Sequence, residues 1–435
     1  MVFEVGLSEL RGVIMNFLDI FSGAGGLSEG FLRAGIEPIA HIERDAYACK
    51  TLETRSIYYY LKRNNQLELY RDYQKSYYAS NTEREERRLG LLEMVPEDEL
   101  EPVMNLEISE STLPLIFQRI DERLAHMGQD QVDLIIGGPP CQAYSLVGRA
   151  RDEKNMEDDP RNYLYKLYVR FLTRYQPKAF VFENVPGILT AFKGTLFKNL
   201  QAYMKRVGYN IEARKLNAKD FGVLQDRKRI IIVGWRKDID FQFPLIEPHM
   251  EDNVVNDLLN DLPKLSSGQV ATNSNYILPR HMLLERISIR KNGDIVTHHE
   301  ARSHIQRDLD IYRIVVEMWN NERRRLKYTD LPEHLITHKN LTSFLDRFKV
   351  VAGNEYCSHT VVAHISKDGH HYIHPDILQN RSITVREAAR IQSFPDDYFF
   401  EGPRTSNYVQ IGNAVPPLMA EKLADWFKNR LETIG

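Results

Sequence analysis

Five short apolar runs mark the first 235 residues, and stretches with helical periodicity separate them. Short runs that are apolar throughout are typical of strands buried on both faces of a sheet. The intervening helical stretches predict crossover connections, so the alternation favours an α/β fold with a mostly parallel, Rossmann-like sheet and helices on both faces. The runs span residues 16–21, 37–42, 132–136, 179–182 and 229–233.

The length of 435 residues predicts more than one hydrophobic core. An acidic stretch at 238–265 contains Pro244, Pro248 and Pro263, which indicates a boundary. We therefore expect a first domain over 1–237, a smaller second domain over 238–380, and a return to the first domain over 381–435.

Residues 51–107 are rich in tyrosine and in charge, and their periodicity is helical. We interpret them as a helical insertion into the first domain. A solvated appendage without a catalytic role is the favoured interpretation, and binding of a partner by the tyrosines is the alternative.

Composition excludes several classes of protein. The longest apolar runs fall short of the roughly 20 residues that span a bilayer, and the amino-terminal segment lacks a cleavage-site pattern, so we expect a cytoplasmic protein without a membrane span. The net charge of −3 excludes a globally basic nucleic-acid binder. Basic residues are nevertheless in local excess between Lys264 and Arg381, with 17 Lys and Arg against 13 Asp and Glu, which makes this region the candidate nucleic-acid surface.

A glycine cluster at 21–26 follows the first predicted strand and precedes a helical pattern. Glycines allow a backbone to approach a ligand closely, but the spacing is not that of a dinucleotide fingerprint because residue 28 is Ser. Glu43 ends the next predicted strand 20 residues after Gly23, where a carboxylate can accept both hydroxyls of a ribose. The two features together predict a site for an adenosine-bearing cofactor.

Cys141 is the cysteine whose surroundings indicate chemistry. Cys49, Cys141 and Cys357 show no CxxC spacing, which argues against a disulfide framework or a zinc site. An isolated cysteine is usually a small buried hydrophobe. Cys141, however, stands in the loop GGPPCQAYS directly after a predicted strand, at the sheet edge where open α/β folds place their active sites. We expect it to be a nucleophile.

Glu183 repeats this arrangement at the end of the strand 179–182, with Pro186 breaking the chain shortly afterwards. A glutamate in this position can cap the following helix. Beside Cys141 on a neighbouring strand it can instead act as a general acid toward a ring nitrogen.

Three further segments have a functional and a structural interpretation. The polar stretch 142–159 is favoured as a gate over the site rather than an ordinary exposed loop. The basic run 321–327 suits phosphate contacts and a solvated helix face about equally. The histidines at 370–374 have no cysteine or carboxylate set beside them in the sequence, so we expect no metal site.

Six motifs make the chain resemble the C5-cytosine DNA methyltransferase family, of the bacterial restriction-modification type, in both order and approximate spacing. They cover most of the chain outside the insertion and the 240–380 region. The motifs are FSGAGGLSEGF, GGPPCQAYS, ENVPG, QDRKRI, RSITVREAARIQSFPDDY and QIGNAVPP.

The resemblance implies a sheet that binds S-adenosylmethionine, with a target-recognition domain over 238–380. It implies methylation of a flipped cytosine in double-stranded DNA, a monomer, and a restriction endonuclease of the same specificity as a possible partner. The catalytic residues that it implies are Cys141 as nucleophile, Glu183 at the cytosine N3, and Arg227 and Arg229 at the target base. The cofactor-binding residues that it implies are Phe21, Gly23, Gly25, Gly26, Glu43, Pro140, Leu164, Asn413 and Val415.

One position departs from the family pattern. The family usually has a Gly-Asp pair before the nucleophile's strand to accept from the adenine amino group, and this chain has Leu106 and Glu107. We assign Glu107 to that contact as a substitute.

Two other functions are compatible with the fold. An RNA cytosine methyltransferase would use the same chemistry, but the large 240–380 region favours duplex DNA, whose bases are distinguished along a groove. A DNA-binding regulator that has lost the chemistry would not need Cys141, Glu183 and Arg229 together.

Overall fold

The computed structural model describes residues 15–140, 164–243 and 252–433. Cys141 and the whole of the predicted gate at 142–159 lie outside these residues. Among the described residues, no helix is both long and apolar enough to cross a membrane.

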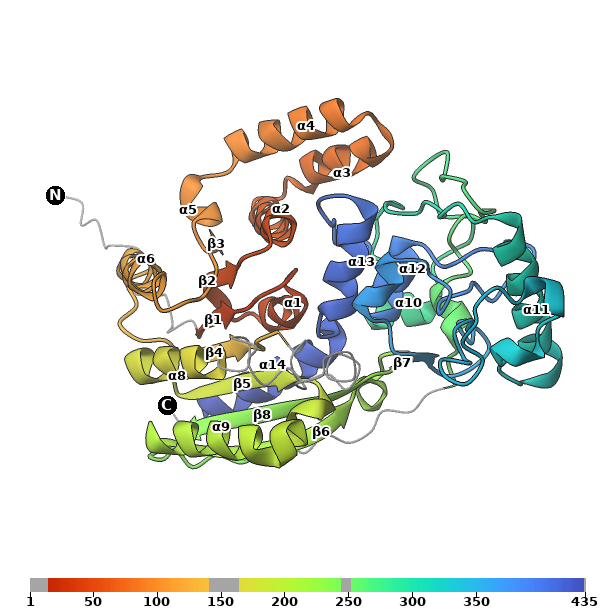
Figure 1. Ribbon diagram of the computed structural model, residues 1–435. Helices are drawn as coiled ribbons and strands as arrows, with labels where there is room; N and C mark the ends of the chain where they lie inside the picture. Colours follow the sequence, from red (N-terminus) through yellow and green to blue (C-terminus); the bar gives the residue numbers. More distant parts are fainter. Residues whose placement is uncertain (1–14, 141–163, 244–251, 434–435) are drawn as a thin grey trace.

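A seven-stranded mixed sheet forms the centre of the molecule, in the order β3-β2-β1-β4-β5-β8-β6 (Figure 1). Strands β3, β2, β1, β4 and β5 run parallel, whereas β8 is antiparallel to both β5 and β6. The α/β prediction is therefore confirmed, and all five apolar runs are strands. The bounds are β1 Asn16–Ile20, β2 Glu37–Glu43, β3 Val103–Asn105, β4 Leu134–Gly137, β5 Ala179–Asn184, β6 Tyr209–Asn217 and β8 Lys228–Arg236.

Alternate residues of the central strands face two separate hydrophobic clusters, as the period of two of a strand requires. Phe17, Ile136 and Val181 pack with the helices α1 (Gly26–Arg33) and α14 (Pro417–Glu432). On the other face, Leu18 and Phe180 pack with α6 (Leu113–His126), α8 (Leu164–Tyr175) and α9 (Thr195–Arg206).

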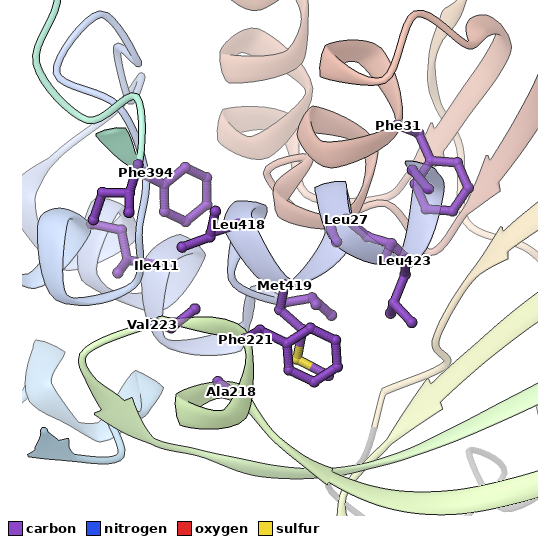
Figure 2. Packing of buried hydrophobic residues seen from close by; sticks show 14 of the residues in the cluster. Leu27, Phe31, Ala218, Phe221, Val223, Phe394, Ile411, Leu418, Met419 and Leu423 are labelled. Atoms are coloured by element: carbon purple, nitrogen blue, oxygen red, sulfur yellow. The ribbon is translucent and has the colours of Figure 1, made fainter. Parts of the chain in front are cut away.

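The carboxyl-terminal helix returns to the first domain and packs directly on α1. Figure 2 shows Leu27 and Phe31 of α1 close to Leu423 of α14. A side chain at Gly30 would place its Cβ 2.2 Å from the backbone nitrogen of Glu421, so the two helices meet backbone to backbone. Glycine is required at this contact for lack of space.

The predicted insertion is helical over most of its length, but its limits differ from 51–107. Helix α2 (Ala46–Arg63) begins before residue 51, and β3 lies inside the interval as the edge strand of the main sheet. Three residues of strand are too few to produce a recognisable pattern. The other helices are α3 Leu67–Lys75, η1 Ser76–Tyr78, α4 Asn81–Met94 and α5 Glu97–Leu100.

The inserted helices are not a solvated appendage. Their tyrosines form a hydrophobic cluster of their own that also takes in Phe399 from the carboxyl-terminal part of the chain. Tyr70 and Tyr73 are almost completely buried there. In Figure 1 these helices stand above the sheet, beside α13 (Arg404–Asn413).

The region 252–380 consists mainly of short elements and has a separate core around α11 (Gln306–Glu322). Its two-residue strand β9 (Ser358–His359) pairs in parallel with β7 (Gln225–Asp226) of the first domain. The remaining elements are α10 Met282–Arg286, η6 Val255–Leu258, η7 Tyr328–Asp330, η8 Glu333–Leu335 and η9 Ala363–Ser366. Three further short helices lie in the first domain: η3 Pro186–Leu189, η4 Ala191–Gly194 and η5 Ala218–Phe221.

Residues 381–401, which we call the polar junction, connect the sheet, the inserted helices and the second region. They contain α12 (Val385–Ile391), which begins with a capping box between Thr384 and Glu387. Arg381 and Arg386 are 0% exposed, and Arg390 is 1% exposed. Arg390 donates to Asp396 on its own segment and to Asp261 of the second region. The polar junction is therefore joined to the second region by an ionic contact.

Candidate active site

The carboxyl ends of β1, β2, β4 and β5 lie at one edge of the sheet because these strands are parallel and in register. Ile20 aligns with Ile42 on one side and with Gly137 on the other, and Gly137 aligns with Phe182. The sheet order reverses at β1, which makes this edge the switch point where open α/β folds bind their ligands.

The glycine turn after β1 has two different environments. Phe21, Gly23 and Gly25 all have positive φ, at 60°, 55° and 77°. A Cβ on Gly25 would lie 2.7 Å from the Leu52 side chain, whereas a Cβ on Gly23 would meet nothing within 4 Å. Gly25 is therefore required by packing inside the protein, and Gly23 borders open space.

Gly26 joins this turn to the carboxyl-terminal part of the chain. A Cβ on Gly26 would lie 2.4 Å from the carbonyl oxygen of Val415 and 2.8 Å from the Ala414 side chain. Val415 is buried, and Asn413, at the end of α13, is exposed. The segment 413–415 thus lies against the glycine turn, although the two are almost 400 residues apart in the sequence.

Glu43 turns its carboxylate toward the same glycine loop. Its Oε2 accepts a hydrogen bond from the backbone N–H of Gly23 at 2.8 Å, and its Oε1 accepts from the N–H groups of Arg44 and Asp45 at 2.9 Å each. Burial raises the pKa of the Glu43 carboxyl, and these N–H donors oppose that shift. Oε1 thus accepts two hydrogen bonds and Oε2 only one, so Oε2 can accept another from a hydroxyl group of a ligand.

Asn105 and Cys49 support the backbone of Glu43, a role that no sequence motif indicates. The amide nitrogen of Asn105 donates to the carbonyl oxygens of Glu43 and Arg44, at 3.2 and 3.0 Å. Cys49 donates its thiol to the Glu43 carbonyl at 3.3 Å. Asn105 is paired with Glu43 in the β2–β3 register, which only the paired strands reveal.

Glu107 follows β3, the strand that pairs with β2 and carries Asn105 opposite Glu43. It forms an ion pair with Arg44 at 3.2 Å, and both side chains are more than half exposed. An exposed pair of this kind contributes less than about 1 kcal/mol, so the carboxylate is available to other partners. Phe21 and Leu164 pack against the same hydrophobic cluster on the α6 and α8 side of the sheet.

Glu183 and Arg229 form the second charged feature of this edge. The Nε of Arg229 lies 2.8 Å from Oε1 of Glu183, and the two side chains are only 11% and 15% exposed. Oε2 of Glu183 lies 2.9 Å from the position that a Cβ on Gly138 would occupy. A larger residue at 138 would therefore displace the glutamate.

The chain leaves β4 directly over this pair. Pro139 accepts a hydrogen bond through its carbonyl oxygen from the Asn184 side chain at 3.1 Å. Pro140, half-buried, is the last residue described before Cys141. Glu183 and the approach to Cys141 are thus held together by β4, β5 and one side-chain hydrogen bond.

Comparison with known proteins identifies the family. The family model for C-5 cytosine-specific DNA methylase matches residues 15–68 and 116–429. The type II methyltransferase M.Bpa9945I of Bacillus paralicheniformis is 42% identical, and the match covers 94% of this chain and 98% of that protein. M1.HphI of Haemophilus parahaemolyticus is 31% identical, with 94% and 86% covered.

The chain belongs to the C-5 cytosine-specific DNA methylase family. It is a DNA (cytosine-5)-methyltransferase. Solved structures agree on the fold: a DNA modification methyltransferase encoded within an E. coli prophage superimposes with a TM-score of 0.61 at 23% identity, covering 96% of this chain and 99% of that one. The methyltransferase EhMeth of Entamoeba histolytica gives a TM-score of 0.54 at 15% identity, covering 97% and 99%.

Arg227 has different partners from Arg229 in this methyltransferase. It is 0% exposed and donates to the carbonyl oxygens of Val361 at 2.7 Å, Gly412 at 3.0 Å and Ala414 at 2.8 Å. The expectation that both arginines reach the target base therefore needs correction. Arg227 lies between β7 and β8, which belong to different sheets, and its hydrogen bonds connect the second region and the end of α13 to this point of the chain.

The two cysteines that the structure describes are poor nucleophiles. Cys49 is 2% exposed, and burial raises the pKa of its thiol to about 12. Burial also raises the pKa of the Cys357 thiol. Since the thiolate is the reactive form, neither residue is suited to attack a base.

The basic run 321–327 lies at the end of α11 and just beyond it. Arg323, Arg324 and Arg325 are exposed, and Arg324 pairs with Glu322 at 3.2 Å and with Asp330 at 2.9 Å. Among the residues that the structure describes, no group of three or more His, Cys, Asp or Glu side chains is placed to hold a metal ion. In the histidine run, the ring of His370 is hydrogen-bonded to the Tyr312 hydroxyl at 2.7 Å.

Proposed function

We propose that this enzyme transfers a methyl group from S-adenosylmethionine to C5 of a cytosine that has rotated out of a specific duplex DNA sequence, through a covalent bond between Cys141 and C6. The observation that carries the proposal is the Glu183–Arg229 pair, held against Gly138 three residues before Cys141. Family membership supports cytosine as the substrate.

The glycine turn and Glu43 fit the cofactor. Glu43 would accept the ribose hydroxyls, Gly23 would let the backbone approach, and Asn413 and Val415 would close the pocket beside Gly26. The exposed Glu107 would take the adenine amino group in place of the aspartate usual in the family. S-adenosylmethionine, when bound, supplies a methyl group whose carbon is electrophilic.

The protein residues make C5 of the cytosine reactive. The Cys141 thiolate adds to C6, which removes the aromaticity of the ring and places negative charge at C5 and N3. Glu183 hydrogen-bonds N3 through the carboxyl oxygen that lies beside Gly138, while Arg229 fixes the other oxygen and adds positive charge at the site. After C5 has gained the methyl group, a base removes the C5 proton, the C6–sulfur bond breaks, and the thiolate leaves.

The second region would recognise the DNA sequence. We assign target recognition to 238–380, with the exposed Arg323 and Arg325 as phosphate contacts, and catalysis to 1–237 and 381–435. The base must leave the stack to reach Glu183, at a cost of a few kcal/mol. Relatives named type II methyltransferases support a restriction endonuclease of the same specificity as a functional partner. We expect the enzyme to act as a monomer.

Bisulfite sequencing of host DNA after expression tests the proposal. We expect one short sequence to become methylated at C5 of cytosine, and Cys141→Ala to remove that methylation. Methylation of RNA alone, or full methylation by Cys141→Ala, would contradict it.

A further inference from the structure

A turn of the second region, residues 291–294, docks on the inserted helices. Lys291 donates through Nζ to Oδ2 of Asp397 at 2.6 Å, and its Nζ lies 5.7 Å from the centre of the Tyr58 ring on α2. Arg71 on α3 donates to the carbonyl oxygen of Asn292 at 3.1 Å. A Cβ on Gly293 would lie 2.4 Å from the Arg71 guanidinium, so the turn fits closely over that side chain.

The contact continues along the chain after the turn. The Tyr78 hydroxyl donates to the Val296 carbonyl oxygen at 3.2 Å. The Tyr77 ring lies 4.5 Å from the ring of His298, which is fully buried and hydrogen-bonded to the Phe400 carbonyl at 2.8 Å. Helices α2, α3 and η1 therefore hold 291–298 at four successive points.

The same helices are anchored to α1, which follows the glycine turn at 21–26 (the proposed cofactor loop). Arg55 on α2 donates to Oδ1 of Asp397 at 2.8 Å and to both carboxylate oxygens of Glu29 at 2.6 and 2.8 Å. Glu29 belongs to α1, which begins at the last glycine of the glycine turn. An uninterrupted chain of charged contacts thus runs from α1 through Arg55 and Asp397 to Lys291.

Most of this chain of contacts is buried. Glu29, Arg55 and Asp397 are 1%, 3% and 3% exposed. Burial alone would raise the pKa of Asp397, but Arg55 and Lys291 hold it well below its ordinary value, so the carboxylate stays charged. Buried ion pairs are costly to desolvate and are often no more stable than apolar residues of the same size, so their value here is the fixed geometry they impose.

We infer that the inserted helices act as a brace that fixes the position of the second region relative to the cofactor loop, with Arg71 and Lys291 as positioning residues for DNA recognition. This inference rests on the proposed role of 238–380 in recognition. Neither side chain needs to touch DNA. Loosening the turn should weaken DNA binding and site discrimination without changing the chemical step.

The test uses Arg71→Ala, alone and combined with Lys291→Met, in the full-length enzyme. Arg71 is a partly exposed surface residue, so its removal leaves no buried charge. The matched control is Lys75→Ala, one turn further along α3. Lys75 forms an ion pair with Asp72, and both side chains are more than half exposed. We measure kcat, KM for a cognate duplex, affinity for S-adenosylhomocysteine, melting temperature, and methylation of near-cognate sites.

For the double variant we expect KM for DNA to rise about 10-fold and discrimination against near-cognate sites to fall about 10-fold, the latter equivalent to roughly 1.4 kcal/mol. Arg71→Ala should show part of this effect and Lys75→Ala none, while kcat and the affinity for S-adenosylhomocysteine stay within about 2-fold. Unchanged KM and discrimination in folded Arg71→Ala and double variants would overturn the brace. If the double variant fails to fold, Arg71→Ala decides alone. A wild-type enzyme that does not methylate DNA would instead refute the proposed function.

Discussion

The carboxyl edge of the sheet and the polar junction at 381–401 both hold charged side chains away from bulk water, but they do so differently. At the edge, Glu183 is held by one ion pair with Arg229, and glycines at 23 and 138 border the charged groups. In the junction, Arg386 is fully buried and donates to the oxygens of Thr297, Pro395 and Tyr398. Charged groups that can still form hydrogen bonds are available to a substrate, whereas charged groups whose hydrogen bonds are all made within the protein stabilise the fold.

Arg227 and Arg229 show the same contrast two residues apart. Arg229 keeps one carboxylate partner at the site, and Arg227 donates to three backbone carbonyls from two other parts of the chain. Their shared motif could not distinguish these roles. Arg227 lies between β7 and β8, which belong to different sheets, whereas Arg229 lies within β8.

The largest expected effect is on turnover at the edge. Glu183→Gln keeps the shape of the side chain but removes the acid, so kcat should fall by about 10² to 10⁴, the usual range for a positioned general acid. The free energy of unfolding should change by no more than about 1 kcal/mol. Single-turnover kinetics and urea unfolding measure the two quantities. Full activity would remove Glu183 from the mechanism.

A charge removed from the junction should act on stability instead. Arg390→Met leaves Asp261 and Asp396 without their shared guanidinium, and a broken buried pair typically costs 3–5 kcal/mol, so we expect a loss of about that size. The exposed Arg324→Met is the control and should cost less than about 1 kcal/mol. Equal stability of the two variants would show that the junction is not structural.

Glu43→Ala sharpens the comparison at the other end of the edge. Loss of charge-assisted hydrogen bonds to the ribose should weaken cofactor affinity by about 2–4 kcal/mol. Glu107→Ala should have a smaller effect, because its carboxylate is exposed and paired with Arg44. Calorimetry with S-adenosylhomocysteine measures both, and wild-type affinity in Glu43→Ala would refute its assignment to the ribose.

The smallest expected effect is a pH dependence of stability at the junction. Burial lowers the pKa of His299 to about 4, and its ring is hydrogen-bonded to Thr384 and Pro263. Between about pH 6.5 and 4 the unfolded chain binds a proton that the folded protein excludes. As the pH is lowered through this window, the free energy of unfolding therefore decreases by up to about 1.4 kcal/mol per pH unit from this group. Above that window His299 contributes no pH dependence.

Unfolding by urea at several pH values tests this linkage. His299→Gln should flatten the slope relative to the wild type, and a variant of the exposed His126 should not. An identical slope in His299→Gln and the wild type would contradict the assignment.

The sequence predicted the parts of the fold that depend on continuous apolar runs. All five predicted strands exist, and Glu43 and Glu183 stand at strand ends as expected. It did not predict β6, because Glu212, Arg214 and Lys215 interrupt its apolar residues. The antiparallel direction of β8 was also missed, since periodicity carries no information on direction.

Contacts between residues far apart in the sequence were also not predicted. The segment 413–415 could be placed beside Gly26 only by resemblance, and the support of Glu43 by Asn105 depends on strand register. The arginines of the junction look like surface charges in a sequence, because their acceptors come from distant segments such as Asp261 and Thr297.

Trapping with DNA that carries 5-fluorocytosine at the target position tests the central claim most directly. If Cys141 adds to C6, methyl transfer leaves C5 with fluorine and no proton to remove, so the thiolate cannot leave and the enzyme stays attached. We expect a species stable on a denaturing gel, with peptide mapping to Cys141, and none from Cys141→Ala. A wild-type enzyme that methylates normal cytosine but forms no adduct, or an adduct mapped to Cys49 or Cys357, would contradict the account.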